Sequence, residues 1–255
     1  MDVVDALGVS WVDFAVPRPT TRTMTETTAL IVAHGQPSDP DPAEAALARF
    51  AARVAASAPG LSVHSATLAA PGRLEAVLEG LPETVPIYPL FMARGWFVTS
   101  ALPRRLGGRA NPILDPLGID QGLPALIAAH LAKELDQRGW PLADSALVLA
   151  AHGSGRSRNP SAVANGFAEQ LQSHLGLARL SVGFVEETPS ITEAARRHGA
   201  MSLCLPFFAC AGGHANEDVP QALEQAGYAG DLLPVLGELP PVPALIARRI
   251  SEAGR

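Results

Sequence analysis

Apolar and polar positions along the chain follow two alternating periodicities, one typical of strands and one of helices. Short apolar runs such as ALIVAHG (29–35) and SALVLAAHG (145–153) are typical of buried strands. Between such runs the apolar residues fall on one helical face, as in 123–139. The pattern predicts strands at 29–35, 61–70, 85–93, 112–118, 145–153, 177–186, 201–210 and 232–238, and helices at 42–58, 72–81, 101–106, 123–139, 161–176, 190–199, 216–227 and 241–253.

The order of these elements occurs twice, and matching landmarks keep a nearly constant spacing. His34 and His152 are 118 positions apart, and Pro103 and Pro220 are 117 apart. Several landmarks that hold one offset are hard to obtain by chance, so we infer an internal duplication.

Repeated strand–helix units predict parallel strands with right-handed crossovers and helices on both faces. The expected fold class is α/β, with two duplicated doubly wound domains, each a four-stranded parallel sheet flanked by helices. The expected division is an N-terminal arm or linker at 1–28, a first half at 29–140 and a second half at 141–255. Because Met24 stands just before the first strand, whether residues 1–23 belong to the natural protein stays open.

Composition and charge narrow the class of protein. Hydrophobic residues make up 47% of the chain and charged residues 17%, which predicts a packed core rather than disorder. A net charge of −6 argues against a nucleic-acid partner. The chain shows neither an apolar run long enough for a membrane span nor a basic start typical of a signal peptide, so we expect a cytoplasmic protein. Two cysteines, Cys204 and Cys210, fit a reducing compartment.

Chemistry-bearing residues stand at the predicted strand ends of the second half. His152 ends the first strand, Glu186 the second, and His214 follows the third. Carboxyl ends of neighbouring parallel strands share one crevice, so we expect these side chains to converge. Two imidazoles and a carboxylate suit Fe, Co, Ni or Zn, and they can accept protons near neutral pH. A lone histidine is more often an ordinary polar residue, but this pair lies in glycine-rich turns. Of Glu186 and Glu187, only one should face the crevice, and we favour Glu186.

The first half lacks most of these groups. His34 retains the strand-end histidine, whereas Leu68 stands 118 positions before Glu186 and Phe97 stands 117 before His214. We therefore expect the first half to be degenerate. Its Trp96 and Phe97 either form a wall for an aromatic ligand or pack between the halves.

The second half also carries family motifs. The segments LVLAAHGSGRSRNPSAVANGFAEQL, GFVEETPSITEA and LPFFACAGGHANEDVP strongly resemble the CbiX family of sirohydrochlorin chelatases, class II chelatases of cobalamin and siroheme synthesis, in the long two-half form. The resemblance covers roughly residues 29–250. It implies a lyase that inserts Co²⁺, preferred, or Fe²⁺ into the tetrapyrrole sirohydrochlorin, with the metal as substrate and no permanent cofactor. It further implies that His152 and His214 bind the metal and that Glu186 helps to remove protons.

The same resemblance implies residues that bind the carboxylate-rich macrocycle. Gly212 and Gly213 would let the backbone approach a flat ligand. Ser154 either caps the following helix or hydrogen-bonds the ligand. Arg156 and Arg158 either clamp substrate carboxylates, as Arg94, Arg104 and Arg105 could also do, or are solvated surface residues.

Other interpretations of the sequence remain. A non-catalytic metal or tetrapyrrole carrier derived from the same fold would also fit a degenerate first half. A phosphoryl-transfer enzyme is disfavoured, because the chain has no Walker-type loop. Sirohydrochlorin is the expected small-molecule partner, and the chain is either a monomer or a homodimer.

Overall fold

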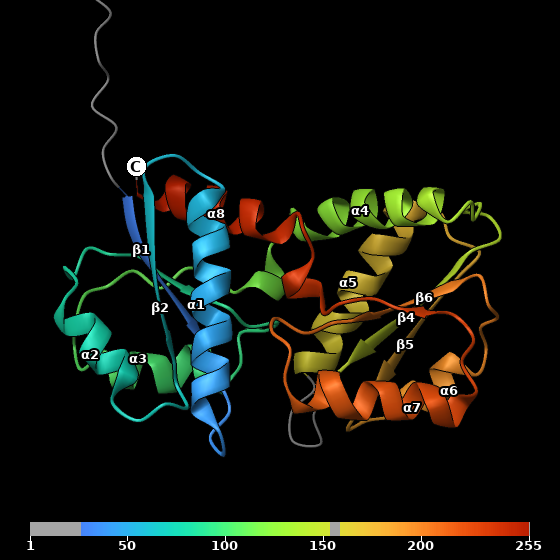
Figure 1. Cartoon of the computed structure of the whole chain (residues 1–255), viewed down its shortest axis with the longest axis horizontal. Helices are drawn as coiled ribbons and strands as arrows, with labels where there is room; N and C mark the ends of the chain where they lie inside the picture. The colour runs from blue at the N-terminus through green and yellow to red at the C-terminus, as the bar shows by residue number, and fades with distance from the viewer. Residues whose placement is uncertain (1–26, 154–158, 255) are drawn as a thin grey trace, which may run out of the picture.

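The computed structural model describes residues 27–153 and 159–254, which form two α/β halves lying side by side (Figure 1). The first half comprises β1 (Thr27–Ala33), α1 (Pro40–Ala56), β2 (Leu61–Thr67), α2 (Arg73–Glu79), β3 (Ile87–Pro89), the π-helix η1 (Phe97–Ala101), α3 (Leu102–Arg105), the 3₁₀-helix η2 (Leu117–Ile119) and α4 (Leu123–Gln137). The second half comprises β4 (Ala146–Ala151), α5 (Asn159–Leu175), β5 (Arg179–Phe184), α6 (Ile191–Ala195), β6 (Ser202–Pro206), the π-helix η3 (His214–Asp218), α7 (Val219–Ala226), β7 (Asp231–Leu232), the 3₁₀-helix η4 (Leu236–Glu238) and α8 (Val242–Ala253). Within the described part of the chain, no helix is both long enough and apolar enough to cross a membrane.

Each half is built on a parallel sheet. In the described residues the strand orders are β2-β1-β3 and β5-β4-β6-β7, with all neighbours parallel. The first strand of each half therefore lies in the interior of its sheet, and the chain winds to either side of it. The predicted α/β class with duplicated parallel sheets is confirmed. The carboxyl ends of β4 and β6 lie side by side at the point where the winding reverses, which is where such sheets place their sites.

The fourth strand of the first half is shorter than predicted. A full strand was expected at 112–118, but the described residues there form a single parallel bridge between Ile87 and Ile113. Pro112 and Pro116 flank this bridge, and proline has no N–H to continue a ladder. The first sheet is therefore three-stranded. Its counterpart in the second half, β7, ends early as well, two residues before Pro234.

Alternate residues of each central strand face different helical layers. Leu30 and Val32 are fully buried with side chains of α2 and α3, whereas Ile31 faces a different cluster. In β4, Val148 and Ala150 pack with residues of α6 and α7. This period of two is what a strand covered on both faces requires.

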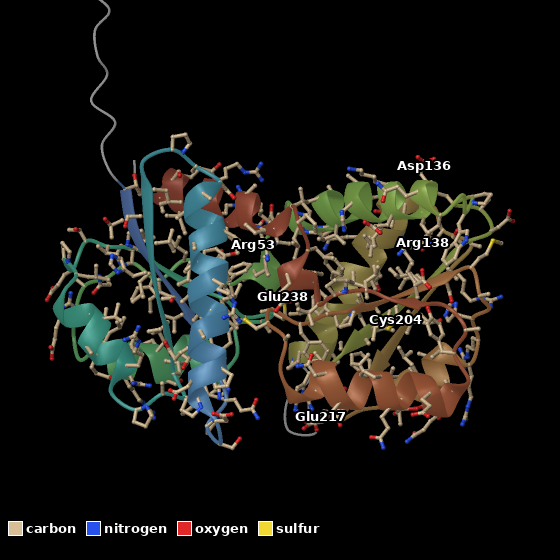
Figure 2. All side chains as sticks on the ribbon, viewed as in Figure 1. Arg53, Asp136, Arg138, Cys204, Glu217 and Glu238 are labelled. Carbon is tan, nitrogen blue, oxygen red and sulfur yellow. The ribbon has the colours of Figure 1, made fainter. Side chains whose placement is uncertain are left out.

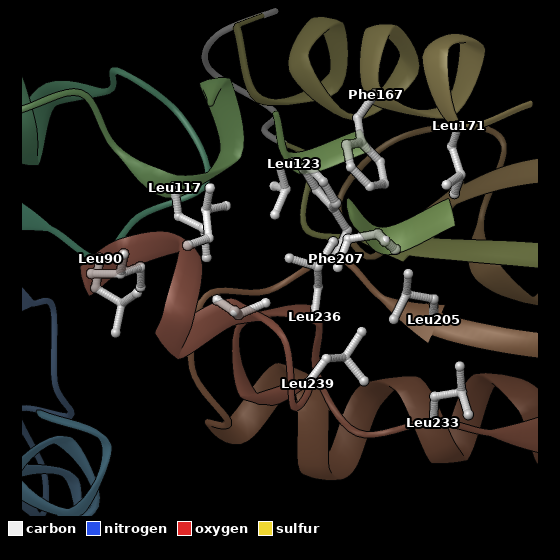
Figure 3. Packing of buried hydrophobic residues seen from close by; sticks show 14 of the residues in the cluster. Leu90, Leu117, Leu123, Phe167, Leu171, Leu205, Phe207, Leu233, Leu236 and Leu239 are labelled. Carbon is white, nitrogen blue, oxygen red and sulfur yellow. The ribbon is translucent and has the colours of Figure 1, made fainter. Parts of the chain in front are cut away.

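The last helix of each half covers the other half. Helix α4 packs against α5 of the second half, and α8 packs against α1 of the first (Figure 1). A single buried cluster consequently contains residues of both halves, among them Leu117, Leu123, Phe167, Phe207 and Leu236 (Figure 3). The division at residue 140 stays a prediction from the repeat, and the core is continuous across it.

Polar contacts also tie the two halves together. Arg249 of α8 donates two hydrogen bonds to the Asp120 carboxylate before α4, at 2.7 and 2.9 Å. Arg53 of α1 donates to the backbone oxygen of Glu238 at 3.2 Å, where α1 faces the second half (Figure 2). These contacts fix the orientation of the two strand-end surfaces relative to each other.

Candidate functional site

Two histidines of the second half meet at the carboxyl edge of its sheet. His152 directly follows β4, and His214 begins η3 after the loop that follows β6. Their ring centroids are 4.4 Å apart, with the ring planes at 83°. The side chains are 39% and 46% exposed, so both rings are accessible to a ligand. The structure thus brings together two residues 62 positions apart in the sequence.

The backbone turn after β4 orients the His152 ring. Its Nδ1 lies 2.9 Å from the carbonyl oxygen of Gly153. Gly153 has a φ of +70°, and a Cβ at this position would approach Glu187 Cγ at 3.1 Å and Phe184 Cβ at 3.2 Å. Only glycine fits this turn without displacing a neighbour. Since a carbonyl can only accept, Nδ1 is the protonated nitrogen and Nε2 keeps its lone pair.

Glu186 lies beside the same histidine. Its backbone N–H donates to the His152 carbonyl oxygen at 3.0 Å, and its Oε2 lies 3.8 Å from His152 Nδ1. That distance is too long for a hydrogen bond but suits a charge partner. The neighbouring Glu187 instead places its Cγ near Gly153. Of these two glutamates, Glu186 is therefore the one that pairs with the His152 ring.

No closed metal centre is built from these groups. Among the described residues, no three side chains of His, Cys, Asp or Glu are placed to hold an ion together. A metal bound here by the two imidazoles would keep open coordination positions, which is typical of sites where the metal reacts rather than stabilises the fold.

The first half has a similar pair of rings, but only one of them is an imidazole. His34 Nδ1 lies 2.7 Å from the Gly35 carbonyl oxygen, as in the second half. Phe97 begins η1 where His214 begins η3, and its ring centroid lies 4.3 Å from that of His34 at 69°. The same fold position therefore holds a phenyl ring in place of an imidazole.

The structure corrects the residue matched to Glu186. Just as Glu186 N–H donates to His152 O, the N–H of Ala69 donates to His34 O at 2.8 Å. The counterpart of Glu186 is Ala69 and not Leu68, because the offset at the second strand is 117 and a constant 118 was assumed. Leu68 matches Val185. Leu68 packs against the buried cluster formed with α2 and α3, and Val185 packs against the one formed with α6 and α7. The first half carries no carboxylate at this position under either alignment.

A cavity of about 750 Å³ opens between the halves and includes both ring pairs. This volume suits a substantial organic ligand. Its lining residues from the first half include His34, Phe50, Phe91 and Phe97, and those from the second include His152, Phe207, Phe208, Cys210, His214, Glu217, Asp218 and Glu238. Among the described lining residues none is Lys or Arg. The cavity therefore combines apolar walls with a histidine pair and an acidic margin.

Two features of the lining limit its chemistry. Burial, with a smaller contribution from the Glu238 carboxylate, raises the pKa of the Cys210 thiol to about 12, so this cysteine is neutral near pH 7. Phe97 faces the cavity, and Trp96 packs against its edge with 5.2 Å between ring centroids and 59% of its own surface exposed. Of the two uses expected for these aromatics, the structure favours a cavity wall at Phe97.

The remaining predicted binding residues have different outcomes. Gly212 and Gly213 line the cavity, and a Cβ at either position would meet no described atom within 4 Å. Their role toward a ligand stays a prediction, and Ser154, Arg156 and Arg158 lie outside the described residues.

Two of the other arginines considered as clamps already have acidic partners. Arg105 donates two hydrogen bonds to the Glu75 carboxylate, at 2.7 and 2.5 Å, and Arg94 forms an ion pair with Asp115.

Asp218 was given no role from the sequence, although it belongs to the segment AGGHANEDVP that carries the family resemblance. Its Oδ2 lies 2.5 Å from Nδ1 of His214, four residues earlier. The available signal was the His-x-x-x-Asp spacing, which puts both side chains on one face of a helical turn.

Comparisons with known proteins agree with this geometry. The family model described as CbiX matches residues 146–253. A solved structure described as CbiX, the terminal enzyme for biosynthesis of siroheme in denitrifying bacteria, is 47% identical over 89% of this chain and 99% of its own, with a TM-score of 0.80. Two SirB structures from Bacillus subtilis, one described with Fe³⁺ and one with cobalt, are 16% and 17% identical over 90% of this chain and 96% of their own. Their TM-scores of 0.69 and 0.64 show a shared fold. A search of curated proteins found no match.

Proposed function

Because this chain belongs to the CbiX family, we propose that it is a sirohydrochlorin chelatase, a lyase that inserts a divalent metal into the tetrapyrrole for siroheme or cobalamin synthesis. The observation that carries the proposal is the edge-to-face pair of His152 and His214 at the margin of a 750 Å³ cavity. The 47% identical relative, described as the terminal enzyme of siroheme biosynthesis, supports the substrate.

The histidine pair is proposed to bind the incoming metal. Nδ1 of His152 lies by the Gly153 carbonyl oxygen, which leaves the lone pair on Nε2, and the centroid of the His214 ring lies 4.4 Å from that of His152. Two imidazole ligands displace some of the water around the ion and leave positions for the pyrrole nitrogens. The metal is a substrate, so binding must be reversible, and the partial exposure of both rings suits this.

Proton removal is proposed to depend on Glu186. Each pyrrole N–H that becomes a metal ligand must lose its proton as the metal–nitrogen bond forms. Glu186 Oε2 lies 3.8 Å from Nδ1 of His152, the ring nitrogen that is not the proposed metal ligand. A carboxylate beside a ligand histidine can take up the released protons by general base catalysis, which contributes about 10²–10⁴-fold in typical enzymes.

The macrocycle is proposed to occupy the cavity between the halves. Phe97 and Phe91 of the first half, with 6.0 Å between their ring centroids, offer an apolar wall opposite the histidine pair. The acidic residues Glu217 and Glu238 would repel the carboxylates of the substrate, so the substrate carboxylates must point away from them, toward the cavity mouth. Arg156 and Arg158 are the proposed partners of the substrate carboxylates.

Metal choice is the finer part of the proposal. Two imidazoles do not separate Fe²⁺ from Co²⁺, because both suit borderline ligands. The resemblance to cobalamin and siroheme chelatases implies Co²⁺ as the preferred metal, whereas the relative described as a siroheme enzyme supports iron. We propose that the chain accepts both metals.

A multiple-turnover insertion assay tests the function. Purified protein is mixed with excess sirohydrochlorin and Fe²⁺, Co²⁺ or Ni²⁺, and the change in tetrapyrrole absorbance is followed against a protein-free blank. Many turnovers per chain are expected with Fe²⁺ or Co²⁺. Stoichiometric binding that stops after one equivalent would instead favour the tetrapyrrole carrier, and no binding at all would reject both interpretations.

A further inference from the structure

We propose that Asp218 is a positioning residue that holds His214 in the tautomer able to bind metal. This inference rests on the proposed function, because it gives a role to the partner of a proposed metal ligand. The carboxylate itself does not have to touch the metal. It acts through the imidazole ring, by deciding which of the two ring nitrogens keeps its lone pair.

The contact geometry defines the tautomer. Asp218 Oδ2 lies 2.5 Å from Nδ1 of His214. An ionised carboxylate has no proton to donate, so the proton of this short hydrogen bond belongs to Nδ1. Nε2 then carries the free lone pair, on the opposite side of the ring. Carboxylate partners of this kind orient ligand histidines and make the free nitrogen a stronger donor to a metal.

Asp218 lies inside one continuous helix, at the junction of η3 and α7, and has helical backbone angles (φ −68°, ψ −41°). Its side chain caps no backbone N–H among the described residues, and it turns back across η3 to His214. The side chain is 44% exposed, so it adds little to the packing of the core. Its printed side-chain contact is therefore with His214, one turn earlier in the same helix, and not with the backbone.

The two histidines reach the same tautomer by different means. His152 Nδ1 faces the neutral carbonyl of Gly153 at 2.9 Å, whereas His214 Nδ1 faces a carboxylate. Both rings consequently present Nε2 as the free nitrogen. Because the Gly153 carbonyl is part of the backbone, substitution cannot remove it, and Asp218 is the acceptor that mutation can change.

The first half shows the same turn without this acceptor. Phe97 and Ala101 begin and end η1 as His214 and Asp218 begin and end η3. The ring that binds metal and the group that orients it are therefore both missing there. His34 keeps its own contact with the Gly35 carbonyl oxygen at 2.7 Å, so one correctly oriented imidazole remains. Because both turns occur in one chain, the first-half turn can be used to test how much a carboxylate at the position of Asp218 strengthens metal binding.

The first test reads the tautomer directly. Long-range ¹H–¹⁵N correlation spectra of ¹⁵N-histidine-labelled protein distinguish Nδ1–H from Nε2–H, with His214 assigned by its loss in His214→Gln. Wild type is expected to show only the Nδ1–H form at His214, and Asp218→Ala to show a mixture. Asp218→Glu, which keeps an acceptor, is expected to restore most of the Nδ1–H form. A wild-type His214 in the Nε2–H form would overturn the proposal.

The second test measures binding of Co²⁺ alone by its visible absorption. Asp218→Ala is expected to weaken binding by about 10- to 100-fold, the usual effect of removing such a partner. Asp231→Asn is the matched control and is expected to bind like wild type, because it removes a carboxylate that pairs with Arg138 and neither residue lines the cavity. If wild type binds and Asp218→Ala binds equally well, positioning is refuted while the metal site stands. If wild type itself binds no Co²⁺, the proposed metal site fails, and the tautomer spectra still decide the role of Asp218.

The third test builds the pair into the first half. In a His214→Ala background, Phe97→His is expected to create a weak Co²⁺ site with His34. Adding Ala101→Asp is expected to strengthen that site about 10-fold or more, since it supplies the missing acceptor. Equal affinity with and without Ala101→Asp would contradict the proposed role of the carboxylate.

Discussion

The two halves of the cavity hold nearly the same ring geometry with different chemistry. The His152 and His214 rings lie 4.4 Å apart at 83°, and the His34 and Phe97 rings lie 4.3 Å apart at 69°. The fold thus places an edge-to-face ring pair at the strand ends whether or not both rings can bind a metal. What separates a proposed reaction site from a wall is the presence of lone pairs and carboxylates on the same scaffold.

The two halves also differ in the carboxylates that lie beside these rings. Ala69 and Ala101 stand in the first half where Glu186 and Asp218 stand in the second. The first half therefore lacks the two carboxylates that lie beside the histidine rings of the second half. A flat macrocycle between them would meet an aromatic surface on one side and the metal on the other.

The largest expected effect is the loss of His214. His214→Ala should abolish metal insertion, because only one imidazole would remain to bind the ion. The side chain is 46% exposed, so the melting temperature should stay close to that of wild type. Insertion kinetics and thermal unfolding of the same preparation check this, and substantial residual insertion would break the assigned difference between the halves.

Glu186→Gln should have the next largest effect. Removal of a general base is expected to lower kcat about 100-fold, toward the lower end of the usual range. Glu187→Gln is the matched control, since its side chain packs at Gly153 while Glu186 lies by the His152 ring. Steady-state rates for the two variants give the comparison, and an equal loss in both would remove Glu186 from its proposed role.

Phe97→Ala should have a moderate effect of a different kind. Loss of an aromatic wall is expected to raise KM for sirohydrochlorin about 2- to 10-fold, from about 0.5–1.5 kcal/mol of ring contact, with a smaller change in kcat. Trp96→Ala should raise KM less, because Trp96 touches the edge of Phe97 and does not line the cavity. A fall in kcat with unchanged KM would show that the first half takes part in the chemical step.

The smallest effect is expected for His34→Ala. Its ring pairs with Phe97, which stands where the second half has His214, so no proposed metal ligand is lost. Insertion should change by less than about threefold in kcat/KM. His152→Ala, the matching change in the second half, should be severe, and a similar loss in both variants would mean that the halves share catalysis.

Much of the fold could be predicted from the sequence, because the order of predicted strands and helices visibly occurs twice. The offset of His34 to His152 and the period of the apolar runs predict two parallel α/β units. The sequence did not predict that α4 would pack against the second half and α8 against the first. Each is an amphipathic helix with one apolar face, and that face alone does not say which sheet it will cover. The direction of the chain after η2 and η4 decides this.

The site was predictable to the level of its strand ends. His152, Glu186 and His214 could be located because parallel strands end at one edge. Asp218 was given no role, because the predicted helix began at residue 216, whereas the structure extends it back to His214 as η3 and so brings the two side chains together. The shortened fourth strand of the first sheet was signalled by Pro112 and Pro116, whose effect on the ladder outweighs the apolar pattern between them.

The central claim is that the second half alone binds the incoming metal through two imidazoles. A crystal grown with Co²⁺ and measured at the cobalt absorption edge tests it most directly. The predicted result is one anomalous peak at about 2.1 Å from Nε2 of both His152 and His214. A peak at His34, or anywhere that leaves either of these two nitrogens unbound, would contradict it.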